Sequence, residues 1–270
     1  MKSLQLLTGI NRRLIVCIRE SIHSFNQYEK DAILIWDEMR TKEHIEYDKN
    51  TDMLYGILDH GEDFRELIAA KEALVFMVKG LTGHWAFPLA YYFSPDSTET
   101  TELVRILDEV LNELENLGIQ VRVCISDMGF TNQGFFRNLG ISETRPYIDR
   151  CDRRIYFIYD PCHLIKLVRT HLQKKTGIRY SGGVALWEHL LCSYEYDSRT
   201  ENRLMPKLTN AHFELTDKTR MKVKLATQVL SHSVYAGIKT LVESEVLDED
   251  AMESATFVKK NERYVRHHEH

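Results

Sequence analysis

Three aspartates stand at the ends of short apolar runs that are typical of β-strands. Asp37 follows the run Ile33–Trp36, and Asp127 and Asp160 each follow a later run of the same kind. Carboxylates that converge repel one another and therefore hold divalent ions, and Mg²⁺ prefers such hard oxygen ligands. Taken singly, each aspartate also fits a polar turn or, for Asp160, a helix cap. Taken together, the three predict a metal site.

A pair of Mg²⁺ ions held in this way has a specific use. The two ions clamp the attacking and the leaving oxygen of an in-line phosphodiester displacement. The chemistry requires that strands far apart in the sequence deliver their carboxylates to one crevice. The elements that surround the aspartates must therefore be placed first.

The first part of the chain alternates between strand and helix signals. We expect a helix over 11–25, strands over 31–39, 73–78, 85–93, 120–126 and 154–159, a hairpin over 43–58, and helices over 96–117 and from 161. Ile33–Trp36 is a continuous apolar run, which favours a strand buried on both faces. This order, with the first strand running beside the fourth, is that of a ribonuclease-H-like domain.

Local signals sharpen several of these boundaries. Pro88 predicts an edge or a bulge within its strand. Asp96 and Glu99 have the spacing of a capping box at the start of a helix, which Gly118 ends. In the strand 120–126, the alternation of valine and isoleucine places Val121, Val123 and Ile125 on one face.

The second part of the chain has a different character. Ser181–Gly183 reads as a flexible linker, and alternation fades beyond it. A short helix is expected over 187–192 and a long one over 216–241. We therefore expect a leading helix over 1–30, an α/β lobe over 31–178 and a mostly helical region over 179–270.

Composition limits the function classes. The 270 residues carry a net charge of −5, which excludes a basic nucleic-acid footprint over the whole chain. The five cysteines are scattered, which favours reduced thiols over a disulfide framework. No apolar run is long enough for a membrane span. The terminal segment His267–His270 is expected to be frayed rather than to form a metal site.

Five short motifs, in order along the chain, resemble those of the P-element-type DNA transposases. They are Leu34–Met39, Glu46–Asp48 with Asp52, Ser126–Gly129 with Asn132–Gly134, Asp160–Lys166, and Met221–Ala226 with Gln228, Val229 and Ser231. The resemblance extends from about Asp31 to Leu241. It implies an α/β fold with a ribonuclease-H-like mixed sheet flanked by helices, followed by a mostly α-helical insertion domain that binds GTP.

The resemblance also implies roles for particular residues. Asp37 and Asp127 would be the first two metal-binding catalytic carboxylates, and Asp160 and His163 an accessory catalytic pair near the DNA. His163 also fits an ordinary half-buried histidine. Lys166 and Arg169 on the same helix fit either contacts with backbone phosphates or a solvated helix face.

The implied activity is metal-dependent cleavage of DNA at transposon ends, followed by strand transfer. The implied cofactors are Mg²⁺ or Mn²⁺ and GTP, the latter by resemblance only, because the sequence has no Walker-type phosphate loop. The implied partners are transposon-end DNA, target DNA and further copies of the chain in a homo-oligomer, and no membrane is implied. The implied location is the nucleus. The GTP-contacting residues are not assigned.

The chain also departs from the family pattern. The third carboxylate, a glutamate that follows the insertion, is not identified, since Glu243, Glu245 and Glu249 resemble a solvated helix end. The zinc-coordinating DNA-binding domain has no counterpart in these residues. Two alternatives therefore stay open. One is a domesticated or truncated non-catalytic relative that acts as a DNA- or protein-interaction module. The other is a generic α/β metal-dependent nuclease.

Overall fold

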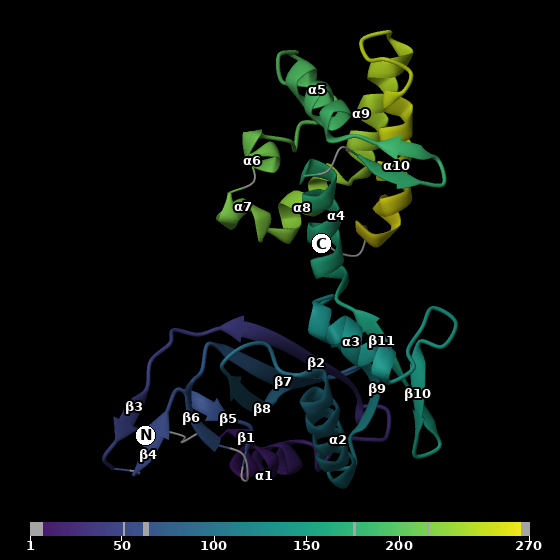
Figure 1. The fold of residues 1–270 in the computed structure, drawn as a ribbon. Helices are drawn as coiled ribbons and strands as arrows, with labels where there is room; N and C mark the ends of the chain where they lie inside the picture. Colours follow the sequence, from purple (N-terminus) through teal and green to yellow (C-terminus); the bar gives the residue numbers. More distant parts are fainter. Residues whose placement is uncertain (1–7, 51, 62–64, 175–176, 215, 266–270) are drawn as a thin grey trace. The chain divides into compact units, whose positions relative to one another are not determined.

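The chain forms two compact units, Met1–Asp160 and Pro161–His270. The computed structural model describes residues 8–50, 52–61, 65–174, 177–214 and 216–265 (Figure 1). The terminal segment His267–His270 lies outside the described residues. The first lobe is expected from the sequence to end at 178, whereas the structure divides the chain between Asp160 and Pro161. Each unit has its own hydrophobic core, so each is described by itself.

Unit 1 is built on one mixed sheet. Its described strands run in the order β10-β11-β9-β2-β7-β8-β5-β6, with β1 paired to β8. Their bounds are Gly9–Ile10 (β1), Asp31–Arg40 (β2), Ile57–Asp59 (β5), Arg65–Ala69 (β6), Glu72–Gly80 (β7), Ala86–Ser94 (β8), Gln120–Ser126 (β9), Tyr147–Arg150 (β10) and Arg153–Tyr159 (β11). The strands Glu46–Asp48 (β3) and Met53–Tyr55 (β4) form the expected hairpin.

The central strand β2 pairs antiparallel with β7 and parallel with β9, so the first strand lies beside the fourth as predicted. Only one face of β2 is fully buried. Leu34 and Trp36 are at most 2% exposed, whereas Ile33 and Ile35 on the other face are partly exposed. The prediction of a strand buried on both faces was therefore wrong. The alternation is that of a sheet with one closely covered face.

A bulge interrupts the pairing of β2 with β9. Ala32 pairs with Val121, but Ile33 pairs with Val123, so that Arg122 is the extra residue. The buried positions of β9 change from Val121 to Cys124 across this point. The expectation that Val121, Val123 and Ile125 share one face was therefore wrong, because a bulge adds one residue and reverses the alternation. A second bulge separates Phe76 from Met77 opposite Pro88, as the proline predicted.

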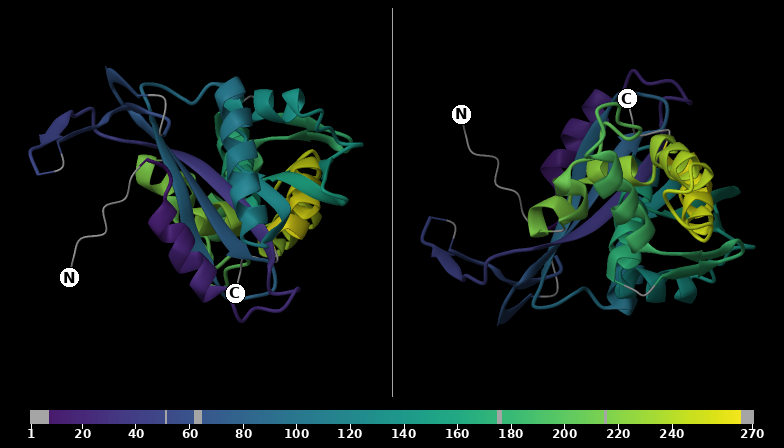
Figure 2. Two further views of the ribbon diagram at one scale, coloured as in Figure 1. Left: turned by 90° about the horizontal axis from the view of Figure 1, so that it is seen from below. Right: turned by 90° about the horizontal axis from the view of Figure 1, so that it is seen from above.

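Three helices cover the buried face of this sheet. They are Arg12–Ser21 (α1), Thr100–Asn116 (α2) and Phe130–Asn138 (α3), and their apolar residues join the core formed by β2, β7 and β8. The view from below shows α1 and α2 running along the strands (Figure 2). The predicted capping box at Asp96 does not form, because α2 begins after Glu99 without a side-chain cap. Gly118 ends α2 at φ +77°, as predicted.

Unit 2 is mostly helical. Its described helices are Pro161–Lys174 (α4), Trp187–Asp197 (α5), Asn210–Phe213 (α6), Asp217–Arg220 (α7), Val223–Val229 (α8), His232–Glu243 (α9) and Ala251–Val265 (α10). Ser181–Gly183 is not a linker, because Ser181 and Gly182 form the turn between β12 (Ile178–Tyr180) and β13 (Gly183–Ala185). The single helix predicted over 216–241 was also wrong, since three helices occupy that stretch. No helix among the described residues is long and apolar enough to cross a membrane.

Candidate carboxylate site

Strand pairing brings Asp37 and Asp127 to the same edge of the sheet of unit 1. The parallel register of β2 and β9 matches Ile35 with Ile125. Asp37 lies two residues further along β2, and Asp127 lies two residues further along the chain, directly after β9, so both reach the carboxyl end of the pair at the same level. The carboxyl ends of parallel strands lie at a common edge of the sheet, and ligands of α/β proteins commonly bind at that edge. The structure thus places the two predicted metal ligands on adjacent strands.

Asp160 reaches this edge on the next strand. β11 runs parallel to β9, with Tyr159 matched to Ser126. The backbone N–H of Asp160 donates to the carbonyl of Ser126 at 2.7 Å, directly before Asp127. Asp160 also occupies the position before Pro161, the first residue of α4, which is where a helix cap belongs. Its position agrees with both interpretations of the sequence.

Asp127 is held by the start of α3. Its Oδ1 accepts the side-chain N–H of Asn132 at 2.6 Å and the backbone N–H of Gly129 at 3.0 Å. A Cβ at Gly129 would come within 3.1 Å of that oxygen, so a residue without a side chain favours this close approach. Both hydrogen bonds fall on Oδ1, and Oδ2 receives neither of them. The carboxylate is oriented before any ligand arrives.

Asn132 links this carboxylate to the core. Its Oδ1 accepts the indole N–H of Trp36 at 2.9 Å, and Trp36 is 2% exposed. The ring of Trp36 stacks on Phe76 and meets Phe135 edge-on. A chain of contacts therefore runs from packed aromatic rings through Asn132 to Asp127. The positioning role of Asn132 was not predicted from the sequence, although Asn132 belongs to the motif that contains Asp127.

Asp37 lies at the exposed end of β2. Its Oδ1 accepts the backbone N–H of Glu38 at 2.9 Å. The side chain of Glu38 has a structural role, because its Oε1 accepts the backbone N–H of Thr98 at 2.7 Å. That bond supplies, from a distant strand, a carboxylate near the start of α2, where no local cap forms. Glu38 therefore serves the fold of unit 1.

A cavity of about 360 Å³ opens beside Asp127. Its lining combines acidic, basic, small polar and aromatic groups from β2, β7, the segment before α2, and the stretch from the end of β9 into α3. The residues are Glu38, Arg40, Glu72, Ser97, Asp127, Gly129, Phe130, Thr131 and Asn132. Arg40 pairs with Glu72 at 3.3 Å, but its side chain is 91% exposed, so this ion pair contributes little. Phe130 is 93% exposed at the rim.

The donor set at this edge fits a hard divalent cation in its chemistry. Asp37 and Asp127 offer carboxylate oxygens, which Mg²⁺ and Mn²⁺ accept readily. No group of three or more His, Cys, Asp or Glu side chains that could hold a metal occurs in the part of the chain that the structure describes. Asp37, Asp127 and Asp160 therefore do not meet as one group of three, and metal binding by Asp37 and Asp127 stays a prediction.

His163 belongs to unit 2 and lies in the first turn of α4, where it is partly exposed. The strand register that gathers the three aspartates does not extend to it. Its role beside Asp160 stays a prediction. Further along the same helix, Arg169 is 0% exposed, so the interpretation of Arg169 as part of a solvated helix face was wrong.

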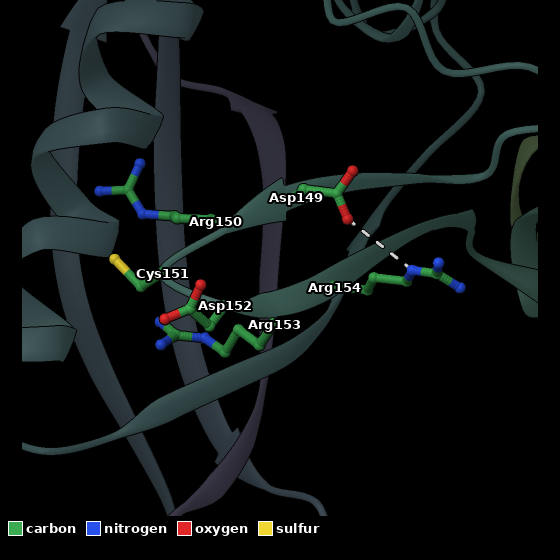
Figure 3. Close-up of a pocket in the computed structure, with 6 residues that line it drawn as sticks. All are labelled: Asp149, Arg150, Cys151, Asp152, Arg153 and Arg154. Carbon is green, nitrogen blue, oxygen red and sulfur yellow. Dashed lines mark ion pairs between the residues drawn. The ribbon is translucent and has the colours of Figure 1, made fainter.

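A second cavity, of about 400 Å³, lies at the turn between β10 and β11 (Figure 3). It is lined by Asp149, Arg150, Cys151, Asp152, Arg153 and Arg154. Arg150 and Arg153 both pair with Glu115 of α2, and Arg150 also pairs with Asp108 at 2.6 Å. Although this cavity is the larger, its charges hold the hairpin to α2. It therefore does not belong to the carboxylate site.

Two family models match the chain along the same division into two parts. Residues 6–140 match the model described as TNP-like, RNase H N-terminal domain, and residues 162–265 match the one described as TNP-like, GTP-binding insertion domain. The chain belongs to the TNP-like family. The α/β class with a ribonuclease-H-like mixed sheet, followed by a helical insertion, is confirmed.

Known proteins of this family are similar over most of the chain. Human DNA transposase THAP9 is 25% identical over 87% of the chain, and the Drosophila melanogaster transposable element P transposase is 26% identical over 86%. The structure of a Drosophila P element transposase strand transfer complex matches 96% of the chain with a TM-score of 0.79 at 24% identity, which supports the fold. The TNP-like chain spans only 27% and 29% of the two curated relatives and 55% of the solved chain.

Proposed function

We propose that this chain supplies part of the catalytic core of a P-element-like DNA transposase. The observation that carries the proposal is the strand register that brings Asp37 and Asp127 to one edge of the ribonuclease-H-like sheet. Family membership supports it, because two relatives are named as transposases. The substrate would be DNA, at transposon ends and then at a target.

Asp37 and Asp127 would hold the metal, and the bound Mg²⁺ or Mn²⁺ would stabilise charge on the attacking and leaving oxygens. The chain's own groups prepare that site. Asn132 and Gly129 fix one oxygen of Asp127 by hydrogen bonds. Asp160, on the neighbouring strand, would add negative charge at the same edge. His163 would follow it toward the DNA as an accessory residue.

The proposed reaction has two displacements at phosphorus. In the first, water attacks a phosphodiester at a transposon end, a P–O bond breaks, and a 3′ hydroxyl is released. In the second, that hydroxyl attacks a phosphodiester of target DNA and becomes joined to its 5′-phosphate end, and the 3′ oxygen of the target strand leaves as a free hydroxyl. The carboxylates supply the charge that a divalent ion requires. Neither step forms a bond to the protein.

Unit 2 would bind GTP, in agreement with the family model that covers residues 162–265. GTP would act as a bound cofactor, since the proposed displacements consume no nucleotide. A protein that acts on chromosomal DNA would work in the nucleus, and fluorescence microscopy of the tagged chain tests this location. A homo-oligomer that pairs two transposon ends also belongs to the proposal, and sedimentation of the chain with end DNA measures it.

Calorimetric titration with Mg²⁺ and Mn²⁺ tests the metal site. The wild-type chain is compared with the double variant Asp37→Asn, Asp127→Asn. A matched control, Asp149→Asn with Asp152→Asn, removes the same charge from the β10–β11 turn of the same sheet. We expect saturable binding in the wild type and in the control, and none in the Asp37, Asp127 variant.

Equal binding in all three proteins would contradict the proposed ligands, because the ions would then respond to net charge alone. Absence of saturable binding in the wild type would favour the second candidate function, a non-catalytic module that interacts with DNA or protein. One observation favours that alternative, namely that the described residues contain no cluster of three metal-binding side chains. Electrophoretic mobility shifts with DNA then measure what such a module retains.

A further inference from the structure

Unit 2 buries a positive charge that no carboxylate among its described residues neutralises. Arg169 on α4 is 0% exposed. Its Nη2 donates to the carbonyls of Thr219 and Arg220 at 3.0 and 2.9 Å. Its Nε and Nη1 are buried and have no hydrogen-bond partner within the described part of the chain. Half of this guanidinium is therefore engaged, and the other half is enclosed without an acceptor.

A second guanidinium, that of Arg220, is near enough to repel the first. The Nε of Arg220 is also buried and lacks a partner among the described residues. Burial, followed by the repulsion from Arg220, lowers the pKa of Arg169. No ion pair joins a carboxylate to either side chain within the described residues. Two adjacent cations without a counter-charge are costly to bury, because each loses its hydration.

An anion is the ligand that such an arrangement fits. Guanidinium N–H groups form a planar fork that matches the oxygens of a carboxylate or a phosphate. The segment Asp217–Lys224, which carries Arg220, contains four basic residues and one acidic residue. This positive potential would favour the approach of an anion with several charges. A polyphosphate therefore fits the site better than a single carboxylate does.

We propose that Arg169 and Arg220 form the phosphate-binding subsite of the nucleotide site in unit 2. This inference rests on the proposed GTP binding and names the groups that would meet the triphosphate. Because these N–H groups are enclosed, the terminal phosphates of a nucleotide fit them better than the continuous backbone of a DNA duplex does. The segment that carries α7 is held to Arg169 by the hydrogen bonds to Thr219 and Arg220, so a movement of this segment would open the site to a ligand.

The test measures binding of guanosine, GDP and GTP by calorimetry on the full 270-residue chain. Arg169→Met removes the guanidinium but keeps an apolar side chain that fills most of its volume. Arg199→Met is the matched control, because Arg199 is an exposed arginine of the same unit. Arg220→Gln is a second variant on the other element. Thermal unfolding with and without pyrophosphate gives an independent measurement in each protein.

We expect Arg169→Met to weaken GTP binding at least tenfold and to leave guanosine binding within twofold. Arg220→Gln is expected to give a loss in the same direction, and Arg199→Met no loss. The rise in melting temperature with pyrophosphate should disappear in Arg169→Met while the melting temperature without ligand does not fall. A purely structural arginine would instead lower the melting temperature without ligand and weaken guanosine and GTP equally.

Unchanged GTP affinity in both arginine variants would overturn this inference and leave GTP binding by unit 2 intact. A wild-type chain that binds no GTP would overturn the nucleotide function itself. If pyrophosphate then still stabilised the chain in a way that depends on Arg169, the site would bind phosphate but not a guanosine nucleotide. If pyrophosphate gave no such stabilisation, the phosphate site would be overturned as well. Competition of short duplex DNA with pyrophosphate would overturn the assignment to a nucleotide.

Discussion

Units 1 and 2 place their charged groups by different physical means. In unit 1, hydrogen-bonded strand register carries Asp37, Asp127 and Asp160 to one edge, where they stay partly or fully exposed. In unit 2, packing of α4 against a segment of short helices encloses Arg169 completely. Register is set by backbone bonds and tolerates charge at a strand end. Enclosure removes a charge from water and therefore leaves it in need of a partner.

The largest expected effect tests how far the site of unit 1 depends on its core. Trp36→Ala removes a side chain that is 2% exposed and stacked on Phe76. We expect a loss of about 3–5 kcal/mol in the free energy of unfolding. Denaturant titration gives this value, and hydrogen exchange assigns it to β2, β7 and β9. The control Tyr156→Ala removes a ring that is 42% exposed on the same sheet. A similar loss in both variants would contradict the core role of Trp36.

The next effect separates orientation of Asp127 from stability. Asn132→Leu breaks the hydrogen bonds to Trp36 and Asp127. We expect this loss to lower the free energy of unfolding by about 1–3 kcal/mol. Loss of an outer-shell partner typically weakens metal affinity about 10–100-fold. Calorimetry with Mn²⁺ measures that loss. Gln133→Leu, which breaks only a bond to the carbonyl of Met128, serves as control. Equal Mn²⁺ affinity in the two variants would show that Asn132 does not orient the carboxylate.

The comparison predicts the opposite sign of effect in unit 2. Replacing a buried ion pair by apolar side chains of similar volume is often neutral or stabilising, and a lone buried cation lacks even the attraction of a partner. We therefore expect Arg169→Met to raise the free energy of unfolding of the ligand-free chain by about 1 kcal/mol. Urea denaturation of the wild type and Arg169→Met gives the difference. A loss of several kcal/mol would mean that the bonds to Thr219 and Arg220 outweigh the buried charge.

The smallest effect concerns acid stability in unit 1. The hydrogen bond from Arg105 lowers the pKa of Glu102 from 4.5, although burial opposes it, and His60 Nδ1 lies 3.1 Å from the carboxylate. A carboxylate with a lowered folded pKa stabilises the protein above its unfolded pKa and loses this contribution as pH falls through the folded value. We expect the free energy of unfolding of the wild type to exceed that of Glu102→Gln by up to about 1 kcal/mol near neutral pH.

This advantage of wild type over Glu102→Gln should shrink as the pH falls below 4.5. Thermal unfolding between neutral pH and pH about 3 measures the difference. The control Glu109→Gln removes the more exposed partner of Arg105, which is 46% exposed. A difference between wild type and Glu102→Gln that is independent of pH would contradict the assigned ion pair.

The amino-acid sequence was sufficient to predict the elements that carry the site of unit 1. Strand runs ending at Asp37 and Asp127 are local patterns, and the order of the elements limits which strands can be neighbours. Whether Asn132 reaches both Trp36 and Asp127 depends on the exact approach of α3 to the sheet. The wrong face assigned to Val123 has the same origin, because a bulge has no clear signature in an alternating run.

Unit 2 was less accessible to sequence analysis. The stretch 216–241 has apolar spacing that fits one long helix, but it forms three. The interruptions arise from caps such as Thr216, whose side chain accepts the N–H of Thr219, and from packing against α4. Arg169 has the same spacing from its neighbours as an exposed helix residue would have. Only the tertiary arrangement shows that it is enclosed.

The bulge at Arg122 makes the carboxylate pair depend on a count of residues. Before the bulge, each residue of β2 faces one that is 89 positions later, as Asp31 faces Gln120; after it, the interval is 90, as Ile35 faces Ile125. With the earlier interval, Asp37 would face Ser126, which is buried on the helix side. Asp37 and Asp127 therefore lie at the same level only because the interval between paired residues is 90 rather than 89. Substitutions along β9 do not change this interval. Deletion of one residue at the bulge would shorten it to 89, although every side chain named in the motif would still be present.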